Sequence, residues 1–306
     1  MPECNISCKI IADSVNGNGN RLTTYELEYP RFIHSEFMTH RLFSRNAASS
    51  RAIPISRVIE NIQADTAKPL HWGKNKRGML ADEEVNNCVW ILGKLYKRET
   101  AWNMSRDHAI HHAKMFSDAG YHKQIVNRLL EPYQMIKVIC SATEYDNFFH
   151  LRNHKDAQPE IHTLAKMMSE AYTMNKPVKL DMFEWHLPYI DQETRDQCVE
   201  YALENGEDLN TVMLKVSASC CAQVSYRKLN PSIDKALKIY DKLVSCTPVH
   251  ASPFEHQASP MSDQPSLNDA GVTHLSRNPI KSFWSGNFRG WVQYRQLINA
   301  HTCWYY

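Results

Sequence analysis

The sequence predicts a fold of the α+β class, because a clear strand pattern stands among several longer segments of helical periodicity. Residues 24–29 read Thr-Tyr-Glu-Leu-Glu-Tyr, so that apolar and polar side chains alternate with the period of a half-buried strand. Residues 135–139 are apolar apart from one lysine and are expected to be largely buried. Helical spacing of apolar residues is found at 83–119, 157–172, 212–226 and 233–244.

The amino-terminal elements follow from these patterns in order. Asn and Gly alternate at 16–20, which indicates a turn before the strand. A proline then opens an apolar run over 30–43, which we interpret as helical and which carries His40 and Arg41. Residues 44–55 are small and polar and are broken by a proline, so we expect a loop able to wrap a ligand.

The middle of the chain is predicted to be mainly helical. Residues 66–82 are interpreted as an inserted surface loop. The helix over 83–119 is expected to stop at the glycine that follows it, and a second helix covers 123–130. Asp156 is a plausible N-cap for the helix over 157–172, which has a proline in its first turn.

The last third begins with a polar connector and ends with an aromatic segment. Residues 176–210 are rich in charge and are expected to contain at least one helix. The two predicted helices that follow lead to His250. A stretch rich in Pro and Ser comes next at 259–266, and the aromatic segment covers 283–294.

The composition disfavours several classes of protein. The chain has 306 residues, 43% of them hydrophobic, enough for one large core or two modest ones. Lys and Arg number 35 and Asp and Glu 33, so no strong net charge indicates binding to nucleic acid or to a membrane. We find neither a membrane span nor a secretory signal. Nine cysteines without a Cys-x-x-Cys pair favour reduced thiols and a cytoplasmic location.

Five short segments hold most of the residues that suit chemistry. The first, at 250–256, reads His-Ala-Ser-Pro-Phe-Glu-His, and the second, at 39–51, reads Thr-His-Arg-Leu-Phe-Ser-Arg-Asn-Ala-Ala-Ser-Ser-Arg. The others are Ala-Gln-Val-Ser-Tyr at 222–226, Asn-Arg-Leu-Leu-Glu-Pro at 127–132, and Asn-Phe-Phe-His-Leu-Arg at 147–152 leading to Ala-Gln-Pro-Glu at 157–160. Each segment alone is a weak signal, whereas the five together are specific.

Together these segments resemble the signatures of the flavin-dependent thymidylate synthases. In that family the His-x-(Thr/Ser)-Pro-Phe-Glu-His element comes first and the His-Arg-x-x-Ser-x-Asn-x-x-Ser-x-Arg element follows closely, whereas here the order is reversed. The resemblance therefore implies a divergent, phage-type member with an α+β fold, an antiparallel sheet with a helical bundle, circularly permuted. A competing partner helix after His256 is 288–295, but it lacks the His-Arg and Ser-x-Arg elements.

The resemblance also implies one permuted catalytic domain over residues 1–306. Chains tolerate such rewiring where termini lie close together at the surface. The expected division has a core at 22–55 and 101–175, insertions at 56–100 and 176–215, the permuted segment of the family's amino terminus at 216–257, and a carboxyl-terminal extension at 258–306.

A pyrimidine nucleotide is the substrate that the resemblance implies. Arg51 and Arg128 would hold its phosphate, Arg152 would hold the uracil ring, and Ser49 and Ser50 complete the substrate-binding set. Guanidinium groups match phosphate oxygens in pairs and also suit the O2 and N3 edge of a pyrimidine. The alternative for each arginine is an ordinary surface or salt-bridged side chain.

FAD is the cofactor that the resemblance implies. The matching residues are His40, Arg41, Asn147, Ser225, His250, Ser252 and Glu255. Serine and histidine suit phosphate and ribose, and an amide suits the isoalloxazine edge. Glu255 is equally explained as a carboxylate on a helix surface, and His250 and His256 as core histidines.

Two other candidate sites are weaker. His108, His111 and His112 invite a metal interpretation, but no carboxylate or cysteine is placed to complete the site, and no metal is predicted. Cys140 and Cys220 lie in apolar contexts that favour inert buried thiols. The family, by resemblance, uses reduced flavin to deliver hydride and needs no cysteine nucleophile.

Three positions depart from the family pattern. Thr39 replaces an arginine, Ala47 replaces a glutamate, and Glu36 replaces a glutamine. Either neighbours such as Arg45 or Lys74 compensate, or the substrate or the transferred group differs.

Glu36 is the departure with the clearest chemical meaning, and with Arg152 it is a candidate catalytic residue. Its carboxylate can accept from the exocyclic amine of cytosine, or it can act as a base toward a water that attacks the one-carbon intermediate. Alternatively, Glu36 only pairs with Arg41 or Arg45 and leaves specificity unchanged.

The implied reaction is one-carbon transfer from methylenetetrahydrofolate to C5 of dUMP, with FAD and NADPH. The implied assembly is a homotetramer with shared flavin pockets, in the cytoplasm (the host cytoplasm if phage-encoded). Its candidate interface anchors are Trp284, Trp291, Trp304, Tyr305 and Tyr306. The alternatives are a hydroxymethylase acting on dUMP or dCMP, and a non-catalytic nucleotide-binding relative.

Overall fold

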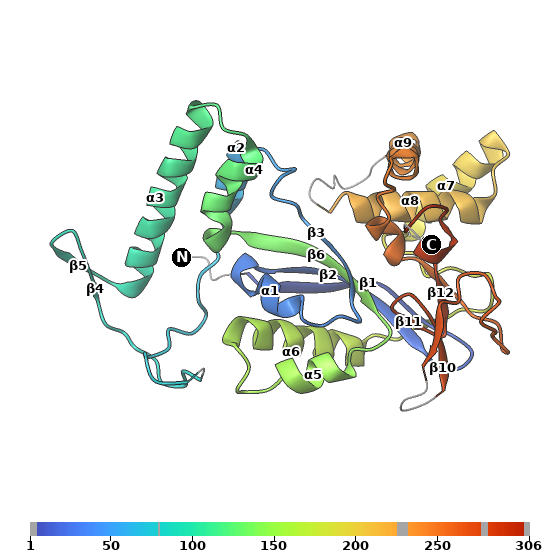
Figure 1. Ribbon diagram of the computed structural model, residues 1–306, viewed down its shortest axis with the longest axis horizontal. Coiled ribbons are helices and arrows are strands. Elements are labelled where there is room, and N and C mark those ends of the chain that lie inside the picture. The colour runs from blue at the N-terminus through green and yellow to red at the C-terminus, as the bar shows by residue number, and fades with distance from the viewer. Residues whose placement is uncertain (1–4, 79, 225–231, 277–280, 303–306) are drawn as a thin grey trace.

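The computed structural model describes residues 5–78, 80–224, 232–276 and 281–302, and its architecture is a mixed α+β fold (Figure 1). A five-stranded sheet in the order β3-β6-β2-β1-β7 lies at its centre. The strands are β1 (Ser7–Val15), β2 (Arg21–Pro30), β3 (Ser44–Ala47), β6 (Met135–Ala142) and β7 (Val178–Lys179). Neighbouring strands are antiparallel except for β1 with β7. The predicted α+β class is therefore confirmed.

The position of β2 in the sheet accounts for the alternation of apolar and polar residues at 24–29. It pairs with β1 on one side and with β6 on the other, and Tyr25 lies between Ile10 and Cys140. The side chains of Tyr25, Leu27 and Tyr29 are fully buried, while the intervening glutamates stay partly exposed. The predicted strand at 24–29 and the buried segment at 135–139 are both confirmed.

Two predictions for residues 30–55 are wrong. The apolar run forms a short 3-10 turn η1 (Arg31–Ile33) and a single helical turn α1 (His34–Phe37), not one long helix. Strand β3 lies inside the segment that was expected to be a loop, and its Asn46 pairs with Ile139 of β6. Small polar residues carry little strand propensity, so the free edge of β6 determines this strand.

Two helices, α5 (Asp146–Arg152) and α6 (Pro159–Met174), lie along one face of the sheet (Figure 1). Phe148 and Met168 from these helices join the buried cluster under β2. The N-cap of α6 is Gln158, not Asp156 as predicted, because the Gln158 side chain accepts from the backbone of Ile161 at 3.2 Å.

A second group of helices comprises α7 (Gln192–Asn205), α8 (Leu209–Ala222) and α9 (Ile233–Ser245). Helix α8 is largely buried and packs with Ile139 of β6, which joins this group to the sheet. The predicted helices at 212–226 and 233–244 are confirmed in type. The polar connector contains α7, as expected.

A helical arm projects from the sheet and contains the largest error of prediction. It comprises α2 (Ile55–Ala64), α3 (Arg98–Asp118), α4 (Lys123–Val126) and the 3-10 segment η2 (Asn127–Tyr133). The predicted helix at 83–119 begins only at Arg98. Before it, β4 (Val89–Ile91) and β5 (Lys94–Tyr96) form a hairpin whose turn residues Leu92 and Gly93 have φ of 47° and 82°.

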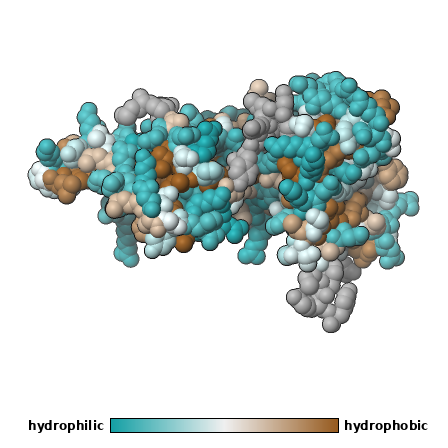
Figure 2. Space-filling view, turned by 90° about the horizontal axis from the view of Figure 1, so that it is seen from above, coloured by the Kyte–Doolittle hydropathy of each residue, from teal (hydrophilic) through white to brown (hydrophobic). Residues whose placement is uncertain are grey.

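The hairpin accounts for the error in the helix predicted over 83–119. Its apolar residues also satisfy a two-residue repeat, and Gly93 supplies the positive φ of a tight turn. Trp90 is 67% exposed and Leu92 88% exposed. Figure 2 shows apolar side chains gathered at this projecting end.

The carboxyl-terminal extension packs at the end of the sheet. The 3-10 turn η3 (Ser252–Glu255) comes just before it. The extension contains β8 (Ala258–Pro260), β9 (His274–Ser276), β10 (Ser282–Ser285), β11 (Phe288–Arg289), β12 (Trp291–Gln293) and η4 (Tyr294–Leu297). Residues 288–295 therefore do not form the competing partner helix. Trp291 is fully buried and donates Nε1 to the Asn20 carbonyl at 3.1 Å, so it is not an interface anchor.

Three general features can be stated for the described residues. No helix there combines the length and apolarity required to cross a membrane. No group of three or more His, Cys, Asp or Glu side chains is arranged to hold a metal ion in the same part of the chain. The seven cysteines within it are free thiols.

Candidate functional site

The two longest signature segments lie side by side despite their separation in sequence. Gln293 bridges them: its Nε2 donates to Ser44 Oγ of β3 at 3.1 Å and to the carbonyl of Glu255 in η3 at 3.0 Å. Asn46 donates to the Cys221 carbonyl at the end of α8, at 3.2 Å. The His-Ala-Ser-Pro-Phe-Glu-His segment is thereby joined to β3, the strand inside the segment at 39–51.

A chain of buried hydrogen bonds holds His256 against the sheet. Ser14 Oγ lies 2.9 Å from His186 Nδ1, and His186 Nε2 lies 2.8 Å from Thr24 Oγ1. Thr24 Oγ1 lies 2.6 Å from Ser141 Oγ, which lies 2.9 Å from His256 Nδ1. Burial lowers the pKa of both His186 and His256 to about 3, so both rings are neutral at neutral pH. His256 is thus a core histidine, the alternative considered for it.

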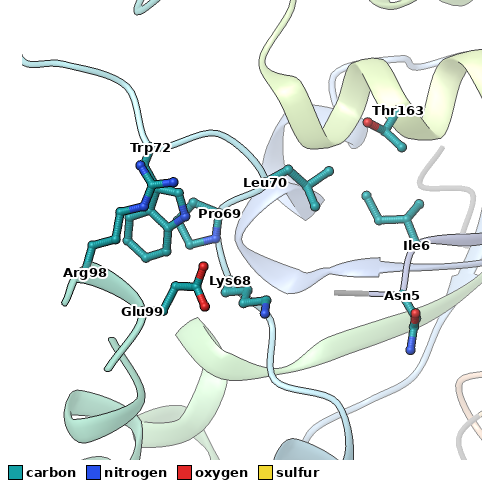
Figure 3. A pocket seen from close by; sticks show the side chains of 9 residues that line it. All are labelled: Asn5, Ile6, Lys68, Pro69, Leu70, Trp72, Arg98, Glu99 and Thr163. Carbon is teal, nitrogen blue, oxygen red and sulfur yellow. The ribbon is translucent and has the colours of Figure 1, made fainter. Parts of the chain in front are cut away.

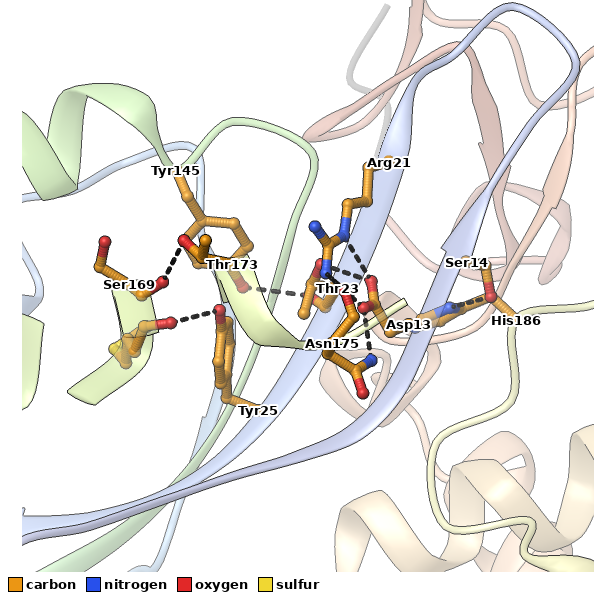
Figure 4. A network of polar contacts seen from close by, with 11 residues as sticks. Asp13, Ser14, Arg21, Thr23, Tyr25, Tyr145, Ser169, Thr173, Asn175 and His186 are labelled. Atoms are coloured by element: carbon orange, nitrogen blue, oxygen red, sulfur yellow. Dashed lines mark hydrogen bonds and ion pairs between the residues drawn. The ribbon is translucent and has the colours of Figure 1, made fainter. Parts of the chain in front are cut away.

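The carboxylate beside this chain also has a structural role. Asp13 of β1 accepts from Arg21 Nε at 2.9 Å, from Thr23 Oγ1 at 2.8 Å and from Asn175 Nδ2 at 2.7 Å (Figure 4). The Arg21 guanidinium also lies 3.7 Å from the centre of the Tyr172 ring. Since these partners saturate Asp13, it ties the sheet to the end of α6.

The Arg152 cluster, which we define as Glu36, His40 and Arg152, unites residues of two signature segments. Arg152 Nη1 forms an ion pair with Glu36 Oε1, and Arg152 Nε donates to His40 Nε2 at 3.2 Å. Glu36 therefore pairs with Arg152 and not with Arg41 or Arg45, the pairing that was considered as an alternative.

Aromatic rings hold the Arg152 cluster in place. The His40 ring lies edge-on to Phe148, with 4.8 Å between centroids, and is stacked on Phe43 at 5.7 Å. Burial, followed by the charges of Arg152 and Arg45, lowers the pKa of His40 to about 4. Because Nε2 of this neutral ring accepts from Arg152, its proton is assigned to Nδ1.

The Glu131 cluster, which we define as Arg31, Ser50, Arg128 and Glu131, lies where β2 and β6 meet η1 and η2. Glu131 Oε1 lies 3.1 Å from Arg31 Nη2, 3.3 Å from Ser50 Oγ and 3.9 Å from Arg128 Nη1. Asn127 is fully buried and donates to the carbonyls of Ser50, at 2.7 Å, and Ile53, at 2.9 Å. The structure thus brings together two of the predicted substrate-binding residues, Ser50 and Arg128.

The remaining predicted substrate residues lie on the same segment as Ser50. Ser49 is partly exposed and Arg51 is exposed. Lys123 Nζ donates to the Ala52 carbonyl at 2.9 Å, which fixes the segment after Arg51.

The predicted flavin residues do not form a single cluster in the described chain. His250 and Ser252 are exposed around η3, Arg41 is exposed before β3, and Asn147 is exposed in the first turn of α5. Glu255 forms an ion pair with Arg295. Ser225, Trp304, Tyr305 and Tyr306 lie outside the described residues, and Trp284 stacks on His274 at 5.8 Å.

Two cavities lie away from all of these residues. The larger, of about 500 Å³, lies between the start of the arm and α6 and is lined by Lys68, Trp72, Arg98 and Thr163 among others (Figure 3). The smaller, of about 330 Å³, lies beside the turn at 16–18 and residues 260–263. Neither is lined by a predicted site residue.

Several residues that shape the site were missed from the sequence. Glu131 and Asn127 lie inside the segment at 127–132, so the sequence indicated that they are near the site but not which contacts they make. Arg31, Gln293 and Arg295 had no signal, because each acts through a contact with a distant part of the chain.

Comparisons with known proteins give limited likenesses. No protein-family model matches this chain, and no curated protein matches it either. Among solved structures, the UMP/dUMP methylase PolB from Streptomyces cacaoi bound with 5-Br UMP is 15% identical, with a TM-score of 0.43 over 56% of this chain and 90% of that chain. The flavin-dependent thymidylate synthase ThyX from Helicobacter pylori, complexed with FAD and dUMP, is 22% identical, with a TM-score of 0.33 over 49% of this chain and 67% of that chain.

Proposed function

We propose that this protein transfers a one-carbon unit from methylenetetrahydrofolate to C5 of dUMP, with FAD as cofactor and NADPH as reductant. The observation that carries the proposal is the contact of Arg152 with Glu36 and His40. His40 and Arg152 belong to two of the segments that resemble the flavin-dependent thymidylate synthases, and Glu36 comes three residues before the first of them. The three meet although more than a hundred residues separate Arg152 from the other two.

Arg152 has the central role in this proposal. Its guanidinium donates to O2 of the pyrimidine and stabilises the negative charge that develops on the ring when C5 reacts. Glu36 and the neutral His40 ring hold the guanidinium from two sides. A group that is held in place before the substrate arrives needs less reorganisation during the reaction.

The residues proposed to bind FAD fit such a cofactor by their chemistry. His250, Ser252, Arg41 and Asn147 are exposed, polar and able to donate hydrogen bonds to phosphate, ribose or a ring edge. When bound, the flavin would supply the hydride that completes the transfer. Glu255 is assigned a supporting role, because Arg295 already pairs with its carboxylate.

We further propose a circularly permuted single domain in a cytoplasmic homotetramer whose sites are shared between subunits. Contact between η3 and β3 supports the permutation, because it joins the two signature elements without a short connection between them. Exposure of the candidate flavin residues on the single chain supports a site that a second subunit completes.

A hydroxymethylase acting on dUMP or dCMP is the second candidate. The Glu36 carboxylate, in contact with the arginine proposed to hold the pyrimidine, favours it. A carboxylate there can accept from the amine of cytosine or activate a water. Thr39 and Ala47 favour instead a non-catalytic nucleotide-binding relative.

A single set of assays on purified protein separates these candidates. We expect flavin absorbance or saturable binding of added FAD, release of the C5 proton from dUMP, and a methylated product by mass. The same measurements with dCMP and with Glu36→Gln test base preference, and light scattering on the active sample tests the assembly.

The outcomes of these assays distinguish the three candidate functions. A protein without FAD binding and without proton release is a binding relative, and a product with the added mass of a hydroxymethyl group identifies the second candidate. If Glu36→Gln keeps the base preference and product of the wild type, Glu36 is structural. A fully active monomer rules out shared sites.

A further inference from the structure

Three donors from separate parts of the chain converge on one oxygen of Glu131. Arg31 Nη2 lies 3.1 Å, Ser50 Oγ 3.3 Å and Arg128 Nη1 3.9 Å from Oε1. They come from η1, from the segment after β3, and from η2. Two guanidinium groups and a hydroxyl around a single oxygen are donors of the kind that binds a phosphate oxygen.

Hydrogen bonds to backbone carbonyls that do not involve Glu131 hold the segments carrying Arg31 and Ser50. The backbone of Arg31 donates to the Gln134 carbonyl at 2.8 Å, which anchors η1 to the end of η2. The Ser50 carbonyl is held by the fully buried Asn127 at 2.7 Å. Because these anchors do not involve the Glu131 carboxylate, the segments that carry Arg31 and Ser50 can keep their positions when it leaves, while the exposed Arg128 side chain can rearrange.

The Glu131 cluster is accessible from solvent. The Glu131 side chain is 27% exposed, and that of Arg128 is 65% exposed, so the cluster opens to solvent. A carboxylate brings one negative charge to two guanidinium groups, whereas a phosphate monoester brings up to two charges and three acceptor oxygens. A phosphate can therefore displace the carboxylate, but it cannot share the position because like charges repel.

We propose that Glu131 occupies the position of the substrate phosphate in the nucleotide-free protein and gives way to it on binding, and that Arg31 is an additional phosphate ligand. The inference rests on the proposed function, since it places the phosphate of the pyrimidine nucleotide at this cluster. It adds a residue and a competing carboxylate that the resemblance does not include. Competition of this kind favours nucleotides over nucleosides, because only a phosphate offsets the loss of the carboxylate contacts.

The test compares binding of dUMP with binding of deoxyuridine, which lacks the phosphate. Calorimetry measures dUMP and ligand-observed NMR measures deoxyuridine, for the wild type, Glu131→Gln and Arg31→Gln. In Glu131→Gln, dUMP is expected to bind roughly tenfold more tightly, because a nearby negative charge is removed. In Arg31→Gln, dUMP is expected to bind roughly tenfold more weakly. Deoxyuridine affinity stays unchanged in both variants.

A matched control is Glu144→Gln. Glu144 is 28% exposed and pairs with Arg289, so it resembles Glu131 in burial and in partner but lies outside the cluster. Its exchange should leave dUMP affinity as in the wild type. Thermal unfolding of each variant confirms that the compared proteins are folded.

The outcomes distinguish this inference from the proposed function. If Glu131→Gln binds dUMP more weakly, Glu131 orients the arginines and the displacement model is overturned. Equal losses for dUMP and deoxyuridine also overturn it, because they indicate a structural role. A folded wild type that binds neither dUMP nor dCMP refutes the proposed function together with the inference.

Discussion

The Arg152 cluster and the Glu131 cluster contain the same pairing, a carboxylate bound to arginine, in different surroundings. At the first, aromatic rings pack around His40, and the Arg152 side chain is 22% exposed. At the second, Arg128 is 65% exposed. Glu131 Oε1 lies 3.1 Å from Arg31 Nη2 and 3.9 Å from Arg128 Nη1. The side chains of Arg31 and Glu131 are only 21% and 27% exposed, so Arg128 is the charged group of this cluster that is open to water.

The difference indicates two ways of preparing for a ligand. Arg152 is held by Glu36 and by a His40 ring that is itself packed among aromatic rings, so its guanidinium loses little freedom on binding, which suits a group that must be aligned with a reacting ring. Exposed charges gain less from each contact because water screens them, but they can rearrange around a phosphate. Under the proposed function, the Arg152 cluster suits alignment of the reacting pyrimidine, and the Glu131 cluster suits binding of the phosphate.

The largest expected difference between the clusters is in the effects of removing their arginines. Arg152→Ala should abolish release of the C5 proton, because no other described group takes its place beside Glu36 and His40. Arg128→Ala should mainly weaken nucleotide binding, at a cost of about 1.5–3 kcal/mol for one charge-assisted contact. Steady-state kinetics and direct dUMP binding measure the two effects. Wild-type kinetics in both variants would show that these segments are wrongly assigned.

An intermediate effect is expected from removing the buried anchor of the Glu131 cluster. Asn127→Ala leaves the carbonyls of Ser50 and Ile53 without their donor, which should cost about 1–3 kcal/mol in free energy of unfolding. It should also weaken dUMP binding, because Ser50 loses its fixed position. Chemical denaturation measures the first effect and calorimetry the second. The exposed Asn87→Ala is the control, and equal stability of the two variants would argue against the anchor.

The smallest effect is an acid sensitivity specific to the Arg152 cluster. Burial lowers the pKa of His40 from its usual 6.5 to about 4, so the unfolded chain takes up this proton first as the pH falls. Its contribution to stability is complete above pH 6.5 and is lost progressively between pH 6.5 and pH 4. The variant His40→Gln should therefore lose less stability across that window than the wild type.

The control for this prediction is the exposed His108→Gln on α3, which should keep the pH dependence of the wild type. His186 and His256 are also buried with lowered pKa values, so part of the acid sensitivity remains in the His40 variant. Denaturant midpoints measured at several pH values give the comparison. Parallel pH profiles for His40→Gln and the wild type would count against a buried neutral His40.

Secondary structure was predictable where a local pattern and the tertiary environment agree. Tyr25, Leu27 and Tyr29 alternate because β2 is covered on one face, and the helical period of α9 matches the face that it buries. The hairpin β4–β5 and strand β3 were missed for opposite reasons. The hairpin has apolar spacing that also fits a helix, while β3 has almost no apolar residues and forms on the free edge of β6.

The sequence by itself determined the α+β class, the central strand and the residues of the five segments, because these follow from local periodicity and from residue identity. Only the tertiary structure decided which of those residues meet. It paired Glu36 with Arg152 instead of Arg41 or Arg45, placed Glu131 between Arg31 and Arg128, and made His256 a core residue. Contacts between charged side chains depend on distances set by strand register and helix packing, and a single sequence does not encode those distances in any local pattern.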